Sequence, residues 1–351
     1  MAENGGYQKT TSEEEARKAI QSECEDDSFK DAVEEDQDEG IPGTFKVKKE
    51  ELAIIRAELA CEFPEDYNYL SDAYILSVAS KPYSKDPTIR RPLEYSQEKL
   101  THVMQWRAEE GAPEMEELVE LANGPESAPA AVENPERLTK AKALANSLNN
   151  GSLYWHGLTK EGRPILWVRT SRKPWYPDVD AEVNALMLLA DAGVRCMPGN
   201  VTDFVCISES SYPPPPNPTF MIKMLKALVR GYPDRLSMLM NAPVSSIVQF
   251  VMNLLLPLMP GRLASKVCLL DIDQMKEKLS DILLNGEMDV PTFFGGPCDH
   301  DALYPDEGKC PNRGQGTLKF DYFGMVERLK KEKDDYERTH PAVAPECLVD
   351  E

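Results

Sequence analysis

The sequence predicts an α/β fold in which a mixed, largely parallel sheet lies under helices and a small helical subdomain comes first. Two patterns support this prediction. Apolar residues recur at helical spacing from residue 45 to about residue 110, and short strand-like and helix-like runs alternate after residue 150. Such alternation implies parallel strands that are joined by right-handed crossovers. With 351 residues, the chain can bury cores of this size without disulfide bonds.

The first segment, residues 1–43, is predicted to be a disordered acidic tail. It contains fourteen Asp or Glu residues and four Lys or Arg residues, so 14 − 4 = 10 of the chain's 21 net negative charges lie in this segment. Because nothing compensates for phosphate repulsion, this charge argues against a nucleic-acid partner. The segment has no apolar run, and the eight cysteines are scattered. We therefore expect no signal peptide and a cytoplasmic protein with free thiols.

Residues 44–125 are predicted to form the helical subdomain. Apolar residues in VKKEELAIIRAELACEF recur at steps of three and four, as on one face of a helix. Residues 69–78 and 93–106 are two further predicted helices, separated by the breaker KPYSKDP. The stretch 111–135 is rich in Pro, Ala and Glu, and it predicts a linker or a loosely packed helix.

The predicted α/β lobe covers residues 126–300, and a C-terminal extension with one helix, 301–351, follows it. The runs LYWHGL and PILWVRTS predict a hairpin because Gly162 supplies a turn between them. Strands and helices then alternate. The predicted strands are 204–210, 236–243 and 266–272. The predicted helices are 181–193, 218–231, 245–258 and 273–284.

The most apolar segment is 244–259, where eleven of sixteen residues are apolar. A membrane span needs about 20 residues, and this run contains Gln249, Asn253 and Pro257, so we do not expect it to cross a bilayer. On a helix, Ser245, Gln249 and Asn253 form one thin polar stripe. The rest of the circumference is apolar and needs a second partner besides the sheet, namely another layer, a ligand or a membrane surface.

Several short motifs surround this segment. In order they are KEGRP at 160–164, Tyr232-Pro233-Asp234-Arg235, Asn241-Ala242-Pro243, Pro257-Leu258-Met259, Lys266 and VPTFFGG at 290–296. Their order resembles that of CRAL-TRIO domains, the lipid-binding lobe of fungal phosphatidylinositol-transfer proteins and of cellular retinaldehyde-binding protein. In that family a Tyr-Pro-Glu-Arg segment, a strand ending in Asn-Ala-Pro, an apolar gate helix and a strand that begins near a lysine follow one another. The resemblance covers roughly residues 45–300.

The resemblance implies that 244–259 is a gate over a buried lipid pocket. It also implies a protein that carries or presents a phospholipid or another hydrophobic small molecule, contacts a membrane surface transiently and uses no cofactor. We thus expect a cytoplasmic, peripherally membrane-associated protein. The residues assigned to the pocket and gate are Val244, Ile247, Val248, Phe250, Val251, Leu254, Leu255 and Leu258.

For the headgroup, Asp234 and Lys266 match the places of a glutamate and a lysine that recognise phosphatidylinositol in the family. A lysine suits the phosphate and a carboxylate suits the ring hydroxyls. The family's threonine before that lysine is Leu263 here, and its arginine-rich stretch appears as ILSVASKPYS. Apolar residues stand at the places of the phosphatidylcholine pattern: Trp155, Leu166 and Val168. A phosphatidylinositol-type phospholipid is the predicted ligand. A sterol-, tocopherol- or retinoid-type ligand, or a scaffold without lipid exchange, remains the alternative.

No catalytic or metal site is predicted. The chain has no Gly-x-Ser-x-Gly, no P-loop and no dinucleotide fingerprint, so an enzyme would need an unmarked site. The four histidines are far apart in the sequence, and Cys298, His300 and Cys310 match no familiar zinc spacing.

Overall fold

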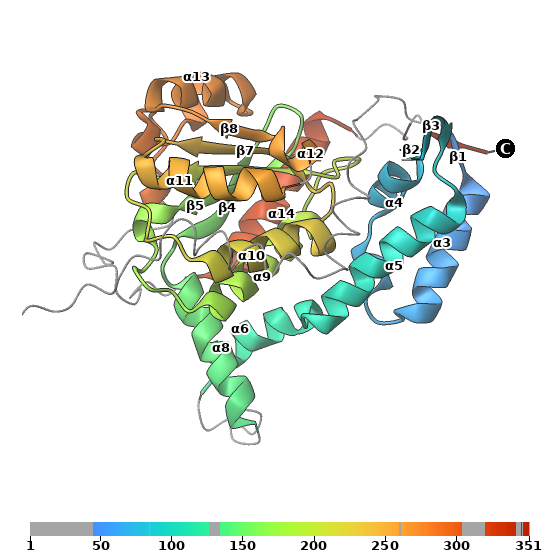
Figure 1. Ribbon diagram of the computed structural model, residues 1–351, viewed down its shortest axis with the longest axis horizontal. Coiled ribbons are helices and arrows are strands. Elements are labelled where there is room, and N and C mark those ends of the chain that lie inside the picture. The colour runs from blue at the N-terminus through green and yellow to red at the C-terminus, as the bar shows by residue number, and fades with distance from the viewer. Residues whose placement is uncertain are drawn as a thin grey trace, which may run out of the picture.

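The computed structural model describes most of the chain from residue 45 onward (Figure 1). The described residues are 45–83, 85–125, 134–259, 261–303, 320–341, 345 and 347–350. The predicted acidic tail and Cys310 lie outside them. No helix in these ranges combines the length and the apolar composition that crossing a bilayer requires.

A five-stranded sheet in the order β4-β5-β6-β7-β8 forms the centre of the molecule. The strands are β4 (Leu153–Leu158), β5 (Pro164–Arg169), β6 (Phe204–Glu209), β7 (Leu236–Ala242) and β8 (Val267–Leu269). β4 runs antiparallel to β5, and the other pairs are parallel. The predicted mixed, largely parallel sheet is thus confirmed. Gly162 turns the β4–β5 hairpin with a φ of 79°, which glycine adopts without strain.

Helices alternate with these strands, as the sequence predicts. They are α9 (Val179–Arg195), α10 (Pro218–Lys226), α11 (Ser246–Leu255), α12 (Gly261–Ala264) and α13 (Ile272–Ile282). α10 continues into one π-helical turn, Ala227–Gly231. Side chains cap the first turns of four of them by accepting a backbone N–H, namely Asp178, Asn217, Ser245 and Asp271.

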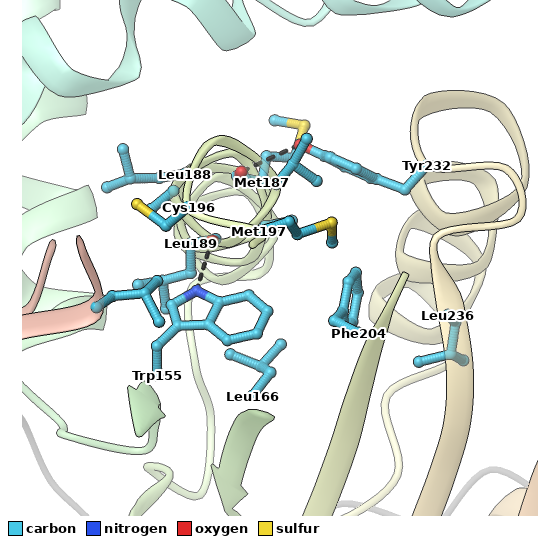
Figure 2. Packing of buried hydrophobic residues seen from close by; sticks show 14 of the residues in the cluster. Trp155, Leu166, Met187, Leu188, Leu189, Cys196, Met197, Phe204, Tyr232 and Leu236 are labelled. Atoms are coloured by element: carbon cyan, nitrogen blue, oxygen red, sulfur yellow. Dashed lines mark hydrogen bonds between the residues drawn. The ribbon is translucent and has the colours of Figure 1, made fainter. Parts of the chain in front are cut away.

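The sheet has two faces with different cover. On the α9 face, the Trp155 indole donates a hydrogen bond of 2.6 Å to the Leu189 carbonyl oxygen, and Phe204 packs edge-on against the Trp155 ring (Figure 2). On the opposite α13 face, Ile207 and Met240 are fully buried. α13 and the closing VPTFFGG loop, whose Phe294 is also fully buried, belong to the same core.

The N-terminal helical subdomain contains α3 (Lys49–Glu62), α4 (Asp72–Ala79) and α5 (Leu93–Glu109), close to the predicted helices. The predicted breaker KPYSKDP instead contributes to a small hairpin, β2 (Pro82–Tyr83) and β3 (Asp86–Arg90). Within 111–135 the structure has α6 (Met115–Asn123), with a buried apolar side. The sequence analysis missed α8 (Pro135–Leu148), which packs between α6 and α9.

A buried arginine joins the subdomain to the lobe. Arg107 of α5 donates to Asp191 of α9 at 2.6 Å and to Asp66 at 3.0 Å, and its guanidinium lies 3.3 Å from the centre of the Tyr69 ring. Tyr232 donates a further hydrogen bond of 2.7 Å to Asp191. Because a buried charge that lacks its partner is costly, these contacts hold the two parts in one arrangement.

The two ends of the described chain also meet. β1 (Val47–Lys48) pairs in parallel with β9 (Leu348–Val349). The predicted C-terminal helix is α14 (Tyr322–Thr339). It packs against the edge strand β4, and Glu332 accepts a hydrogen bond of 3.0 Å from the Gly157 N–H. The C-terminal extension therefore covers the antiparallel edge of the sheet.

Gly193 lets α9 lie directly on the sheet, since a Cβ there would be 2.1 Å from the Trp155 ring. We expect Gly193→Ala to lower the free energy of unfolding by about 1–2 kcal/mol, because overpacking outweighs the gain in helix propensity. The matched control is Gly261→Ala in α12, where a Cβ meets nothing within 4 Å. Urea unfolding of both variants checks this, and equal stability of the two would contradict it.

Candidate functional site

α11 is the apolar helix that the sequence singles out. Its N-cap Ser245 accepts a hydrogen bond of 3.3 Å from the Val248 N–H. The predicted polar residues Gln249 and Asn253 are exposed, so they mark the outer side of the helix. The helix ends at a 3₁₀ turn, Leu256–Leu258, that contains the predicted proline break.

The inner side of α11 packs against α10 and the π-helical turn. Leu254, Leu255 and Met259 form one buried cluster with side chains from that element, which are Met221, Ile222, Leu225 and Val229. This cluster is separate from the main core of the molecule.

The residues predicted for the pocket and gate differ in burial. Val248, Leu254 and Leu255 are buried, whereas 38% of Ile247 is exposed. The others are half-buried: Val244, Phe250, Val251 and Leu258. α11 therefore presents apolar surface outward as well as inward.

The sheet beneath α11 is incompletely covered. Cys206, Leu239 and Val267 occupy one row across β6, β7 and β8 on the α9 face, yet all three are only half-buried. Cys206 lies deep in the protein, where burial raises the pKa of its thiol to about 12. These three side chains therefore keep apolar surface that a ligand could cover. Val267 also touches the cluster around α11, and Figure 1 shows α11 on the side of β7 and β8 opposite α13.

A buried polar group lies beside this row, toward the carboxyl ends of β6 and β7. Asn241 and Ser208 are paired across β7 and β6, and both are buried. In the described part of the chain, the Asn241 Oδ1 atom has no hydrogen-bond partner. A ligand hydroxyl would satisfy this acceptor. Asn241 belongs to the Asn-Ala-Pro motif, but the sequence analysis assigned it no role.

The two predicted headgroup residues lie at the other end of the strands. Asp234 and Lys266 line one small cavity of about 20 Å³, which is room for about one water molecule. They form no ion pair with each other in the described structure. Lys266 donates to the Leu236 carbonyl oxygen at 2.5 Å, whereas Asp234 pairs with Lys81 and, at 3.1 Å, with Arg262.

The ionisation of Asp234 follows from these neighbours. Burial by itself would raise the pKa of this carboxyl group. Lys81, Lys99 and Arg262 outweigh burial and hold the pKa well below its usual range. Asp234 is therefore a buried, charged carboxylate that two cations already contact.

The segment around Asp234 also docks the helical subdomain, a role that the sequence analysis missed. The Tyr74 hydroxyl of α4 donates to the Pro233 carbonyl oxygen at 2.8 Å, and Arg235 lies over the Tyr74 ring at 3.4 Å. Lys81 comes from ILSVASKPYS, the stretch that lacks the arginines of the family. In the sequence, Lys81 was the residue that could have indicated a cation beside Asp234.

Comparison with known families fits this arrangement of an apolar helix over a largely parallel sheet. The sequence model of the CRAL/TRIO domain matches residues 148–296. These residues form a CRAL-TRIO domain. The match includes all five strands of the central sheet and α11. The comparison with curated proteins found no match. A CRAL-TRIO domain binds a lipid or another small hydrophobic ligand, and that coarse function applies to this chain.

The ion pairs of Asp234 make the stability of this protein depend on pH. The native pKa lies below the ordinary value of an aspartate, which is about 4, so the pairing stabilises the fold above about pH 4 and is lost as the pH falls. Asp234→Asn should lower the free energy of unfolding at neutral pH by about 3–5 kcal/mol. The difference from the native chain should shrink in acid.

Glu277→Gln on the exposed side of α13 is the control, and its unfolding curve should follow that of the native chain at every pH. Denaturant unfolding at a series of pH values provides the measurement. A constant difference between the native chain and Asp234→Asn from neutral pH to acid would contradict this account of the ion pairs.

Proposed function

We propose that this protein carries a phospholipid, of the phosphatidylinositol type, and presents it to or exchanges it with membranes. The supporting observation is the incompletely covered row of Cys206, Leu239 and Val267 beneath α11. In the proposed loaded state, acyl chains lie on this row and complete the apolar layer between the sheet and α11. Covalent chemistry has no part in this function.

The energetics explain why such a carrier needs a movable apolar helix. A phospholipid has about 30 methylene groups, and exposing them to water costs about 0.8 kcal/mol each, or about 25 kcal/mol in total. A barrier of that height allows escape into water only about once in 10⁶ seconds. A protein that shields the chains removes most of this cost, but it must open at the bilayer. α11 is the element that we propose as the gate.

We propose that the exposed apolar side chains of the same helix contact the bilayer. Ile247 is exposed, and Phe250 and Val251 are half-buried beside it. If α11 swings outward, these side chains and the buried Leu254 and Leu255 can enter the interfacial layer of a membrane. The apolar outer surface would then provide the transient attachment of a peripheral protein.

Charge around the small cavity supports an anionic headgroup. Arg262 and Lys266 line the cavity together with Asp234, and Lys81 pairs with Asp234 from outside the lining. The three cations exceed the one carboxylate by two positive charges. The whole chain has a net charge of −21, so this local excess is a marked exception. A headgroup phosphate would bind these cations. Asp234, held by its ion pairs, would orient the cations as well as accept from ring hydroxyls.

The size of the same cavity favours a second candidate. About 20 Å³ is far too small for an inositol phosphate, which could enter only after α11 or α12 shifts. A sterol-, tocopherol- or retinoid-type ligand with a single hydroxyl would need less rearrangement. The unpartnered Asn241 Oδ1 provides an acceptor for such a hydroxyl.

Val251→Asp tests the gate. The charge would have to be desolvated whenever α11 closes on a ligand or enters a membrane, so we expect lipid transfer to slow by about tenfold or more. The measurement is transfer of fluorescent phosphatidylinositol between phosphatidylcholine vesicles, with fluorescent sterol transfer run in parallel.

The matched control is Asn253→Asp, which adds the same charge to the exposed side of the same helix. Its transfer rate should stay within about twofold of the native rate. A folded Val251→Asp variant that transfers lipid at the native rate would refute the gate. Transfer of sterol but not of phosphatidylinositol would leave the gate intact and replace the proposed ligand.

A further inference from the structure

A group of potential metal ligands lies on the α13 face of the sheet, away from the proposed lipid row. His156 of β4 meets Cys298 and His300, although 142 residues separate His156 from Cys298. One ligand atom from each residue lies within 4.8 Å of the other two. The Cys298 Sγ atom is 4.0 Å from the His156 Nε2 atom.

An oxygen group lies near the Nδ1 atom of each imidazole. The Tyr154 hydroxyl lies 3.1 Å from the His300 Nδ1 atom, and the Glu332 carboxylate lies 3.6 Å from the His156 Nδ1 atom. Glu332 is itself held in place by the Gly157 N–H. Metal-bound histidines characteristically have a carboxylate or another oxygen group on the second ring nitrogen, because it fixes the ring orientation.

His300 is 1% exposed, and within the described residues its Nε2 atom has no hydrogen-bond partner. A buried polar atom without a partner loses its hydrogen bond to water and gains none, so this arrangement is unfavourable for a histidine that only fills the core. The rings of Trp167 and Phe293 lie edge-on to His300 at 4.8 and 5.5 Å and limit the approach of water. The Nε2 atom is thus the one available for a ligand.

Neighbouring cations do not prevent occupation by a metal. Arg169 and Arg172 are close to this group, but both pair with Asp301, at 3.2 Å for Arg169. Arg169 also lies 3.4 Å from Glu209. These carboxylates balance the guanidinium charges beside His300.

We propose that His156, Cys298 and His300 form a binding site for a divalent transition metal of the zinc class. One thiolate and two imidazoles are a ligand set that zinc prefers. Bonds of about 2.0–2.3 Å in tetrahedral geometry separate ligand atoms by about 3.5 Å, so the three side chains need to close by about 1 Å. Three protein ligands leave the fourth coordination position open.

This site escapes a search for sequence motifs because its first ligand comes from the hairpin. Cys298 and His300 alone have no familiar spacing, and nothing in the sequence pairs them with His156. The proposal does not depend on the lipid function, because the group lies on the other face of the sheet.

The test uses the full chain, freed of metal with a chelator and titrated with Co²⁺ and then Zn²⁺. We expect one ion per chain, a thiolate-to-cobalt charge-transfer band and a Zn²⁺-dependent rise in the melting temperature. Cys298→Ser should abolish the band, and His156→Gln should weaken binding strongly. Cys61→Ser removes an exposed cysteine and should change none of these readouts.

Glu332→Gln tests whether Glu332 positions the His156 ring and does not bind the metal itself. It should weaken Co²⁺ binding by about 10–100-fold while the charge-transfer band persists at saturation. Circular dichroism and urea unfolding verify that each variant is folded. The proposal is wrong if the native chain binds no stoichiometric Co²⁺, or if the band survives in Cys298→Ser. It is equally wrong if Co²⁺ binds without the band and Zn²⁺ does not raise the melting temperature.

Discussion

A sheet that is mostly parallel has two apolar faces, and each of them must be covered. In this protein the α13 face is closed, since Ile207, Met240 and Met275 are fully buried. The α9 face is closed over Trp155 and Leu166 by α9, but the row from Cys206 to Val267 is not. α11 spans this region and packs mainly on α10. The unequal cover of the two faces is the constraint from which the proposed lipid function follows.

The helical subdomain is tied to the lobe near the same site. Arg107 is buried against Asp191, and the Tyr232-Pro233-Asp234-Arg235 segment contacts α4 and Lys81. Lys81 of the subdomain and Arg262 of the lobe both pair with Asp234, which lines the small cavity, so a headgroup there would lie beside the junction of the two parts. A movement of α11 or α12 that admits a ligand would therefore alter the contacts at this junction.

Much of the fold could be predicted because local periodicity and turns encode it. The β4–β5 hairpin, the alternating strands and helices, and the thin polar stripe of Gln249 and Asn253 follow from residues close in sequence. The hairpin β2–β3 was missed because its strands are too short for a periodic signal. α8 was missed because its apolar side is short and its N-terminal flank resembles a linker.

The partners within the candidate site were less predictable for a physical reason. Lys81 and Asp234 are 153 residues apart, and His156 and Cys298 are 142 residues apart. Such contacts depend on how the subdomain docks and on how the closing loop returns to the sheet. The resemblance to CRAL-TRIO domains singled out Asp234 and Lys266 as expected headgroup residues. The ion pairs of Asp234 with Lys81 and Arg262 became visible only in three dimensions.

The central claim is that a lipid completes the apolar layer beneath α11. Native mass spectrometry of the purified full chain, followed by extraction and identification of bound small molecules, tests it most directly. The account predicts one phospholipid per chain, with an anionic headgroup of the phosphatidylinositol type. A chain that is isolated empty and takes up no lipid or sterol from vesicles would contradict it.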